Sequence, residues 1–379
     1  MTKKINNDNI MKPQFELEEE EKQIRNENVD IHEPFDPTKI RVNTRPATID
    51  SVIKRIKYNE INLAPDFQRY ANIWDHKAQS LLIESILIRI PLPAFYMDAT
   101  NEDQWLVIDG LQRLSTLKRF IHEKSLRLTG LEFLTNLEGK SYDDLPRNYQ
   151  RRIDETFLNV YLIEKGTPPE VKFNIFRRIN TGGEPLSNQE LRHALNPGKA
   201  TKFLKNLADS QEFKNITNLS SKRTDRMDDH EFVLGFVAFI LTPYQDYPAK
   251  KGRDYFLNEA MDKINKLDSK KEQEIEDKFK MAMKVAMDIF GDDAFRKLSK
   301  KSKRKYPINK ALFEAWSVTL SQLSYQEIEI LKQRKEILKN TFIEYLDKDK
   351  EFLDSVSQAA NKVNHRFVTI EKIIQETLS

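Results

Sequence analysis

The residues best suited to chemistry are Asp109, Gln112 and Arg113, which share the short segment DGLQR. A carboxylate can hold a magnesium ion or activate water, an amide can orient that water, and a guanidinium can clamp a phosphate. A structural interpretation carries equal weight: Asp109 caps a helix, and Arg113 forms a surface ion pair. Gly110 is expected at positive φ in either case, because a strand-to-helix corner often requires it.

The sequence around this segment predicts a strand that leads directly into a helix. Trp105–Ile108 is an apolar run typical of a buried strand, and apolar residues recur at helical spacing over Leu111–His122. The glycine lies at the break between them. A strand that enters a helix in this way leaves backbone N–H groups at the helix start, where they can bind a phosphate. The pattern therefore indicates an anion site with reactive side chains beside it.

Three other polar clusters precede residue 200, each at a predicted loop or helix end, where functional sites are usually built. They are Gln68 with Arg69, Arg178 and Asn180 followed by Gly182 and Gly183, and Glu190 with Arg192. Each has a structural alternative. Arg69 could form a buried ion pair, and the two glycines could form a helix C-terminal turn. For Glu190, a capping box with Ser187 is favoured over a catalytic role.

The second half of the chain carries the strongest nucleic-acid signal. Arg296–Lys305 (RKLSKKSKRK) is dense in basic residues, which would add a salt-dependent affinity for phosphate backbones. Its candidate DNA contacts are Lys300, Lys301, Lys303 and Arg304. Lys222–Arg226 and Lys250–Arg253 are candidate extensions of the same patch. A solvated loop is the alternative, with nearly equal weight.

Composition narrows the classes of protein to consider. The chain has 379 residues, a net charge of +3 and no cysteine, which excludes disulfides and thiolate zinc sites and fits a reducing cytoplasm. No run approaches the roughly 18 apolar residues of a membrane span, and the start lacks a signal-peptide core. We therefore expect a cytoplasmic protein without membrane contact. Phosphate-loop, G-x-G-x-x-G and H-E-x-x-H motifs are absent from the sequence.

A change in pattern near Gly198 predicts two structured parts. Residues 1–40 are polar and without periodicity, and we expect them to form a disordered arm. Residues 41–198 mix short strands with helices, whereas residues 199–379 show almost only helical patterns. The expected fold class is α+β: a small mixed sheet with helices, followed by an all-α region.

Several motifs follow one another in the order of a known family. They are Pro65-x-Phe67-Gln68-Arg69 with Trp74, Leu82-Ile83-Glu84-Ser85-Ile86-Leu87, Ile90-Pro91-Leu92-Pro93, Val107-Ile108-Asp109-Gly110-x-Gln112-Arg113-Leu114, Phe176-x-Arg178-Ile179-Asn180-x-Gly182-Gly183 and Leu186-Ser187-x-x-Glu190-x-Arg192. Across these motifs, from about residue 45 to about residue 200, the chain resembles the N-terminal domain of GmrSD-type restriction systems, a family with a ParB/sulfiredoxin-like fold.

The resemblance implies a pocket for a nucleoside triphosphate (NTP), with NTP hydrolysis as its proposed activity, and a role in prokaryotic defence against phage or modified DNA. Magnesium is the candidate metal cofactor, because the carboxylate of Asp109 could hold it. Carried over to this sequence, the catalytic candidates are Asp109, Gln112 and Arg113, with Asp109 also the candidate magnesium ligand. The nucleotide-binding candidates are Gln68, Arg69, Gly110, Arg178 and Asn180.

The sequence departs from the family pattern in two ways. Leu111 replaces the first glutamine of the family's Asp-Gly-Gln-Gln-Arg motif, which matters only if that amide contacts the nucleotide rather than the core. No His-Asn-His nuclease motif follows residue 200, so the chain resembles a stand-alone member whose expected partners are DNA and a separate nuclease subunit. Two alternatives stay open: a metal-dependent DNA nuclease that uses the same pocket, and a non-catalytic DNA-binding or regulatory module.

Overall fold

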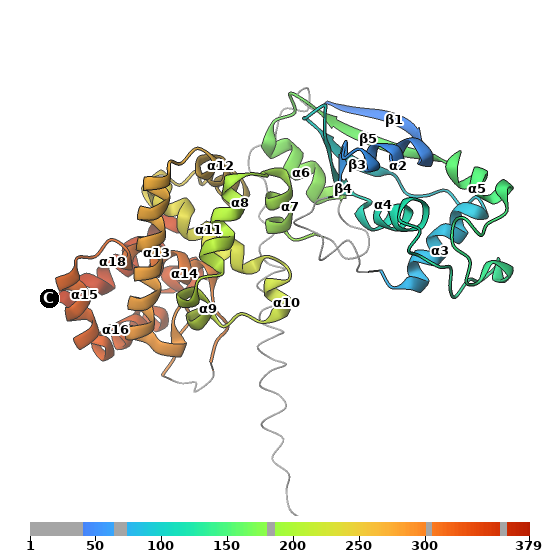
Figure 1. The fold of residues 1–379 in the computed structure, drawn as a ribbon. Coiled ribbons are helices and arrows are strands. Elements are labelled where there is room, and N and C mark those ends of the chain that lie inside the picture. The colour runs from blue at the N-terminus through green and yellow to red at the C-terminus, as the bar shows by residue number, and fades with distance from the viewer. Residues whose placement is uncertain (1–40, 64–73, 180–185, 301–304, 357–361) are drawn as a thin grey trace, which may run out of the picture. The chain divides into compact units, whose positions relative to one another are not determined.

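The computed structural model describes residues 41–63, 74–179, 186–300, 305–356 and 362–379, so the predicted N-terminal arm lies outside the described residues. These residues form two compact units, one ending at Leu186 and the other beginning at Ser187. We call them the sheet unit and the helical unit (Figure 1). The predicted fold class is confirmed, because a small mixed sheet with helices is followed by helices alone.

The sheet unit contains a five-stranded sheet in the order β1-β5-β3-β4-β2. The strands are β1 (Val42–Thr48), β2 (Ile61–Asn62), β3 (Phe95–Ala99), β4 (Trp105–Asp109) and β5 (Phe157–Glu164). β1 pairs antiparallel with β5, and β3 pairs antiparallel with β4. The β3–β5 and β2–β4 pairs are parallel. The sequence did not predict β1, which is mostly exposed and lacks alternation between apolar and polar residues.

One face of this sheet forms the core with four helices. They are α2 (Ile49–Lys57), α3 (His76–Leu87), α4 (Leu111–Leu117) and α5 (Arg147–Asp154), and α4 continues into a π-helical turn over Lys118–His122. The sequence predicts Thr48 and Asp75 as the caps of α2 and α3. Both caps are confirmed, since each side chain accepts the backbone N–H group three residues on. Phe95 and Met97 point into this core, whereas Tyr96 points to the opposite face, because side chains alternate along a strand.

The opposite face is covered at one end by α6 (Pro169–Ile179), which packs against β4 (Figure 1). Lys172 of α6 pairs with Asp98 of β3, with Nζ 3.1 Å from Oδ2, and both side chains are nearly buried. This ion pair fixes α6, and with it Arg178 in its last turn, relative to the strands.

The helical unit contains twelve α-helices among the described residues. They are α7 (Asn188–Leu195), α8 (Lys199–Ala208), α9 (Gln211–Thr217), α10 (Ser221–Thr224), α11 (Asp228–Leu241), α12 (Gly252–Asn265), α13 (Ser269–Phe290), α14 (Lys310–Leu320), α15 (Tyr325–Gln333), α16 (Lys335–Lys348), α17 (Lys350–Ser355) and α18 (Val363–Leu378). α14 is buried along its whole length and α11 along most of it, so these two helices form the centre of the core. Of the described helices, none is both long enough and apolar enough to cross a membrane.

The helical predictions differ from the structure in two places. The pattern over Tyr325–Tyr345 predicts one helix, but the chain forms α15 and α16, which meet at Arg334. The short helices α9 and α10 were not predicted, because four to seven residues are too few to show a helical period. The compact helical unit includes α7, which precedes the change of composition near Gly198.

Candidate functional site

Gly110 is the residue that allows β4 to turn into α4. Its φ of 98° lies in the left-handed region, and a Cβ placed there would lie 2.9 Å from Cε1 of Phe95 and closer still to another atom of that ring. The predicted positive φ is therefore confirmed. The prediction of Asp109 as helix cap is wrong by one residue, since Gly110 occupies the N-cap position and has no side chain to cap with.

Arg113 reaches back from α4 and holds Asp109 in place. Its Nη2 donates to Oδ2 of Asp109 at 2.9 Å and to the carbonyl oxygen of Ala94 at 3.0 Å, and Nη1 donates to the carbonyl oxygen of Pro93. The guanidinium also lies over the ring of Phe95, with Cζ 4.3 Å from the centroid. Arg113 is 9% exposed, so it is not a surface ion pair. It ties the end of β4 and the start of α4 to the beginning of β3.

The Asp109 side chain is more accessible than its partner, at 30% exposed against 11% for Arg113. Partial burial raises the pKa of Asp109 above its ordinary value, although the charge of Arg113 and the N–H of Gly110 oppose this shift. Burial likewise lowers the pKa of Arg113, against the opposing charge of Asp109. A carboxylate with a raised pKa and partial exposure is suited to accepting a proton.

The remaining candidates of the sheet unit fall into three groups. Leu111 packs against the hydrophobic core, so the position at which this sequence lacks the family's glutamine faces inward. Gln112 is partly exposed on the first turn of α4, and Arg178 is exposed in the last turn of α6. Gln68, Arg69, Asn180, Gly182 and Gly183 lie outside the described residues.

The structure places Glu190 and Arg192 in the helical unit, on α7. Ser187 and Glu190 form the predicted capping box, and Glu190 is completely buried with Arg226 3.4 Å away. Arg192 is 1% exposed and pairs with Asp254 and, at 3.8 Å, with Glu231. Both motif residues therefore serve a structural purpose within this unit.

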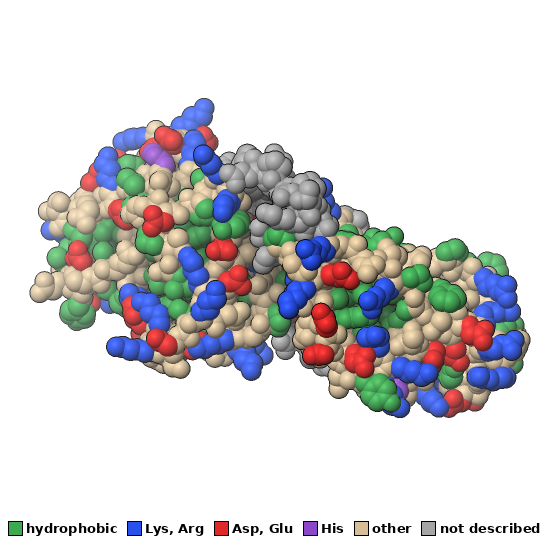
Figure 2. Space-filling model, turned by 90° about the horizontal axis from the view of Figure 1, so that it is seen from above, with side chains coloured by type: hydrophobic (Ala, Val, Ile, Leu, Met, Phe, Trp, Pro, Cys, Tyr) green, Lys and Arg blue, Asp and Glu red, His purple; other side chains and the backbone are tan. Residues whose placement is uncertain are grey.

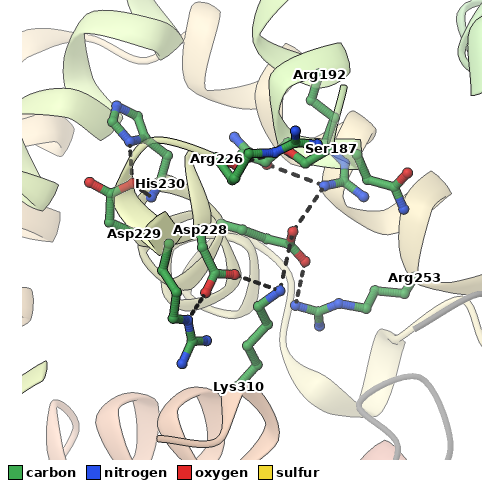
Figure 3. Close-up of polar contacts among 12 residues, drawn as sticks. Ser187, Arg192, Arg226, Asp228, Asp229, His230, Arg253 and Lys310 are labelled. Atoms are coloured by element: carbon green, nitrogen blue, oxygen red, sulfur yellow. Dashed lines mark hydrogen bonds and ion pairs between the residues drawn. The ribbon is translucent and has the colours of Figure 1, made fainter. Parts of the chain in front are cut away.

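These contacts belong to a buried ionic network that joins α7, α10, α11, α12 and α14 (Figure 3). Glu231 lies near three cations: Lys310 at 3.4 Å, Arg253 at 3.6 Å and Arg192 at 3.8 Å. Burial alone would raise the pKa of Glu231, but the charges of Lys310, Arg192 and Arg253 outweigh it and lower the pKa to about 2. Glu231 is thus a permanent anion that holds the helices together.

The network also accounts for two residues of the expected basic patch. Arg223 pairs with Asp228 at 2.5 Å, and Arg253 pairs with Glu314 at 2.6 Å. Both arginines are 6% exposed, so their predicted contribution to an exposed DNA-binding patch is wrong. Lys300 is exposed, whereas Lys301, Lys303 and Arg304 lie outside the described residues. On the face seen in Figure 2, basic and acidic side chains are interspersed.

A magnesium ion could find one protein ligand at the corner, the carboxylate of Asp109. Within the described part of the chain, no three His, Asp or Glu side chains are grouped so that they could hold a metal. A magnesium ion that arrives with a nucleotide needs only one or two carboxylates, since phosphates and water supply the other oxygens. The single carboxylate therefore fits a metal–nucleotide complex better than a resident metal.

The sheet unit is thus a small α+β domain in which Arg113 holds the carboxylate of Asp109 in place where β4 turns into α4. The family model described as "GmrSD restriction endonuclease, N-terminal domain" matches residues 49–196 of the chain. The resemblance inferred from the motifs is confirmed. A comparison of the chain with curated proteins gave no match.

Replacing Gly110 by alanine should destabilise the sheet unit more than the same change at Gly139. Both glycines have positive φ, for which alanine costs about 1–2 kcal/mol, but only Gly110 faces a ring. Overpacking against Phe95 should add roughly 1–3 kcal/mol. Urea unfolding of the two variants measures the difference, and equal losses of stability would show that the ring contact is unimportant.

Replacing Glu231 by glutamine should destabilise the helical unit by at least about 3 kcal/mol, because it leaves buried cations without their anion. The exposed Glu274, which pairs with Lys271 and Lys278, provides the control: Glu274→Gln should leave the urea midpoint nearly unchanged. A small effect of Glu231→Gln would contradict the central role of this carboxylate.

The stability of the helical unit should also depend on acid pH through Glu231. A folded-state pKa of about 2, against an ordinary value of 4.5, means that the contribution is fully present above pH 4.5 and is lost as the pH falls toward 2. The free energy of unfolding should therefore fall less steeply over this interval in Glu231→Gln than in the unaltered protein. Urea titrations at several pH values test this.

Proposed function

We propose that the sheet unit binds a nucleoside triphosphate at the Asp109–Arg113 corner and hydrolyses it, as part of a prokaryotic restriction or anti-phage system. The observation that carries the proposal is the partly exposed carboxylate of Asp109, held 2.9 Å from a buried guanidinium within a GmrSD N-terminal domain. The inward-facing Leu111 supports it too, because the departure from the family motif then removes no group from the corner.

The proposed reaction needs a base and an oriented water. The water oxygen forms a bond to the terminal phosphorus, the bond from that phosphorus to the bridging oxygen breaks, and the diphosphate leaves. The proton of the water goes to a base, for which Asp109 with its raised pKa is suited, and Gln112 on the first turn of α4 can orient the water. Magnesium supplied with the nucleotide would neutralise phosphate charge through its phosphate and water ligands, which leaves the carboxylate of Asp109 to accept the proton.

In this proposal Arg113 acts through Asp109 and not as a phosphate clamp. Its donors are already directed at Asp109 and at the carbonyl oxygens of Pro93 and Ala94. We propose that Arg178 binds the phosphates instead, because its side chain is exposed at the end of α6. Gln68, Arg69, Gly110 and Asn180 remain proposed nucleotide contacts.

The proposal extends to DNA and to a separate nuclease subunit. The basic run Arg296–Lys305 would bind the DNA backbone, and the exposed side chain of Lys300 is consistent with this. In this proposal the separate nuclease subunit cleaves the DNA that this chain binds.

Asp109→Asn should reduce phosphate release from NTPs by about 100-fold or more, the usual contribution of a positioned proton acceptor. Asp103→Asn, a change in the exposed loop before β4, should leave it unaltered. The assay follows inorganic phosphate with purified protein, magnesium and each of the four NTPs. Full activity in Asp109→Asn would refute the role of Asp109 as the base, and no activity in the unaltered protein would refute NTP hydrolysis. Nicking of plasmid DNA that is lost in Asp109→Asn would instead favour the nuclease.

The pH dependence of hydrolysis should report the environment of Asp109. Because its pKa is raised, activity should fall with acid at a pH above about 4, the ordinary range of an aspartate. The charge of Arg113 lowers this pKa, so Arg113→Met should move the acid limb to higher pH, whereas Arg113→Lys should largely restore it. Profiles of kcat/KM against pH measure both shifts. An unmoved acid limb in Arg113→Met would mean that Arg113 does not act through Asp109.

A further inference from the structure

The sheet face opposite the core carries two tyrosines that the proposed hydrolysis does not use. Tyr96 of β3 and Tyr161 of β5 are partly exposed, although their neighbours Phe95 and Val160 are buried on the other face. The two rings stack on each other, with centroids 5.0 Å apart and planes inclined by 13°. Aromatic side chains presented on a sheet are a common surface for stacking nucleobases.

Strand register places these rings beside the candidate acid. Tyr96 is the cross-strand partner of Asp109 on one side, where the register shifts between Tyr96 and Met97 and leaves Ile108 without a partner in the register. On the other side Tyr96 is the partner of Tyr161, which in turn faces Thr44 of β1. Asp109, Tyr96, Tyr161 and Thr44 therefore form one row across four neighbouring strands. Strands lie about 4.8 Å apart, so Tyr161 is roughly 10 Å from the acid. The sugar and phosphates of a nucleotide can span this separation.

The two tyrosines lie where the cover over this face ends. Asp98, two residues beyond Tyr96, is nearly buried because it pairs with Lys172 of α6. In the other direction, Asn159, two residues before Tyr161, is exposed. Among the described residues, α6 thus covers the sheet up to the tyrosines, and Asn159 beyond them is exposed.

We propose that Tyr96 and Tyr161 form the platform against which the nucleobase stacks while the phosphates lie toward Asp109. This inference rests on the proposed function and adds its base-binding part. Stacking uses the π-face that every base has, so the platform accepts all four NTPs and discriminates little among them.

The test compares NTPs with inorganic tripolyphosphate, which has the phosphates but no base, by calorimetry on the full chain with magnesium. The unaltered protein should bind each NTP about tenfold or more tightly than tripolyphosphate. Tyr96→Leu and Tyr161→Leu should remove most of this preference and leave tripolyphosphate binding unchanged. Tyr96→Phe and Tyr161→Phe keep the rings and should retain it. Phe157→Leu, on the same strand but remote from the row, is the control and should change nothing.

The outcomes separate this inference from the proposed function. If NTPs bind no more tightly than tripolyphosphate, or if the leucine variants keep the preference, the platform is refuted while the phosphate site stands. An equal loss of NTP and tripolyphosphate binding in the leucine variants, with unchanged circular dichroism, also refutes it. If neither ligand binds the unaltered protein, the nucleotide function fails, and the platform fails with it.

Discussion

The ion pair between Asp109 and Arg113 is the contact on which the arrangement of the sheet unit's corner depends. It joins the last residue of β4 to the first turn of α4, and the same guanidinium binds the carbonyl oxygens of Pro93 and Ala94 ahead of β3. Gly110 makes the joint possible, because another side chain there would overlap Phe95. The carboxylate of Asp109 is therefore held in place by the protein itself, which supports the catalytic role proposed for it.

Each unit contains a carboxylate beside an arginine, but the pKa values of the two carboxylates are shifted in opposite directions. Glu231 has three cations within 4 Å and is closed off from water, so its pKa falls to about 2 and it stays charged. Asp109 has one cation and partial exposure, so burial prevails and its pKa rises. Environments that shift the pKa values of two carboxylates in opposite directions commonly distinguish structural from reactive groups. This contrast supports the proposal that the sheet unit carries the reactive carboxylate, whereas the ionic network of the helical unit is structural.

Local patterns in the sequence predicted the local structure, but they did not predict contacts between residues that are distant in the sequence. The caps Thr48 and Asp75, the capping box at Ser187 and the positive φ of Gly110 each follow from a few adjacent residues. The acceptors of Arg113 are backbone carbonyls about 20 residues earlier, which leave no trace in side-chain pattern. The exposed strand β1 finds its partner β5 more than 100 residues away. Arg223 and Arg253 were predicted to be exposed, because the density of basic residues in a segment does not indicate which of them are buried.

The family domain and the compact unit end at different residues, and this difference constrains the helical unit. The family match extends to residue 196, whereas the sheet unit ends at Leu186. The helix between, α7, is fixed by Glu190 and Arg192 to charged partners on α11 and α12 and to Arg226. Moving α7 away would break several buried pairs, each typically costing about 3–5 kcal/mol when one partner is lost. Helix α7, which carries the last motif of the family, therefore belongs to the helical unit and not to the sheet unit.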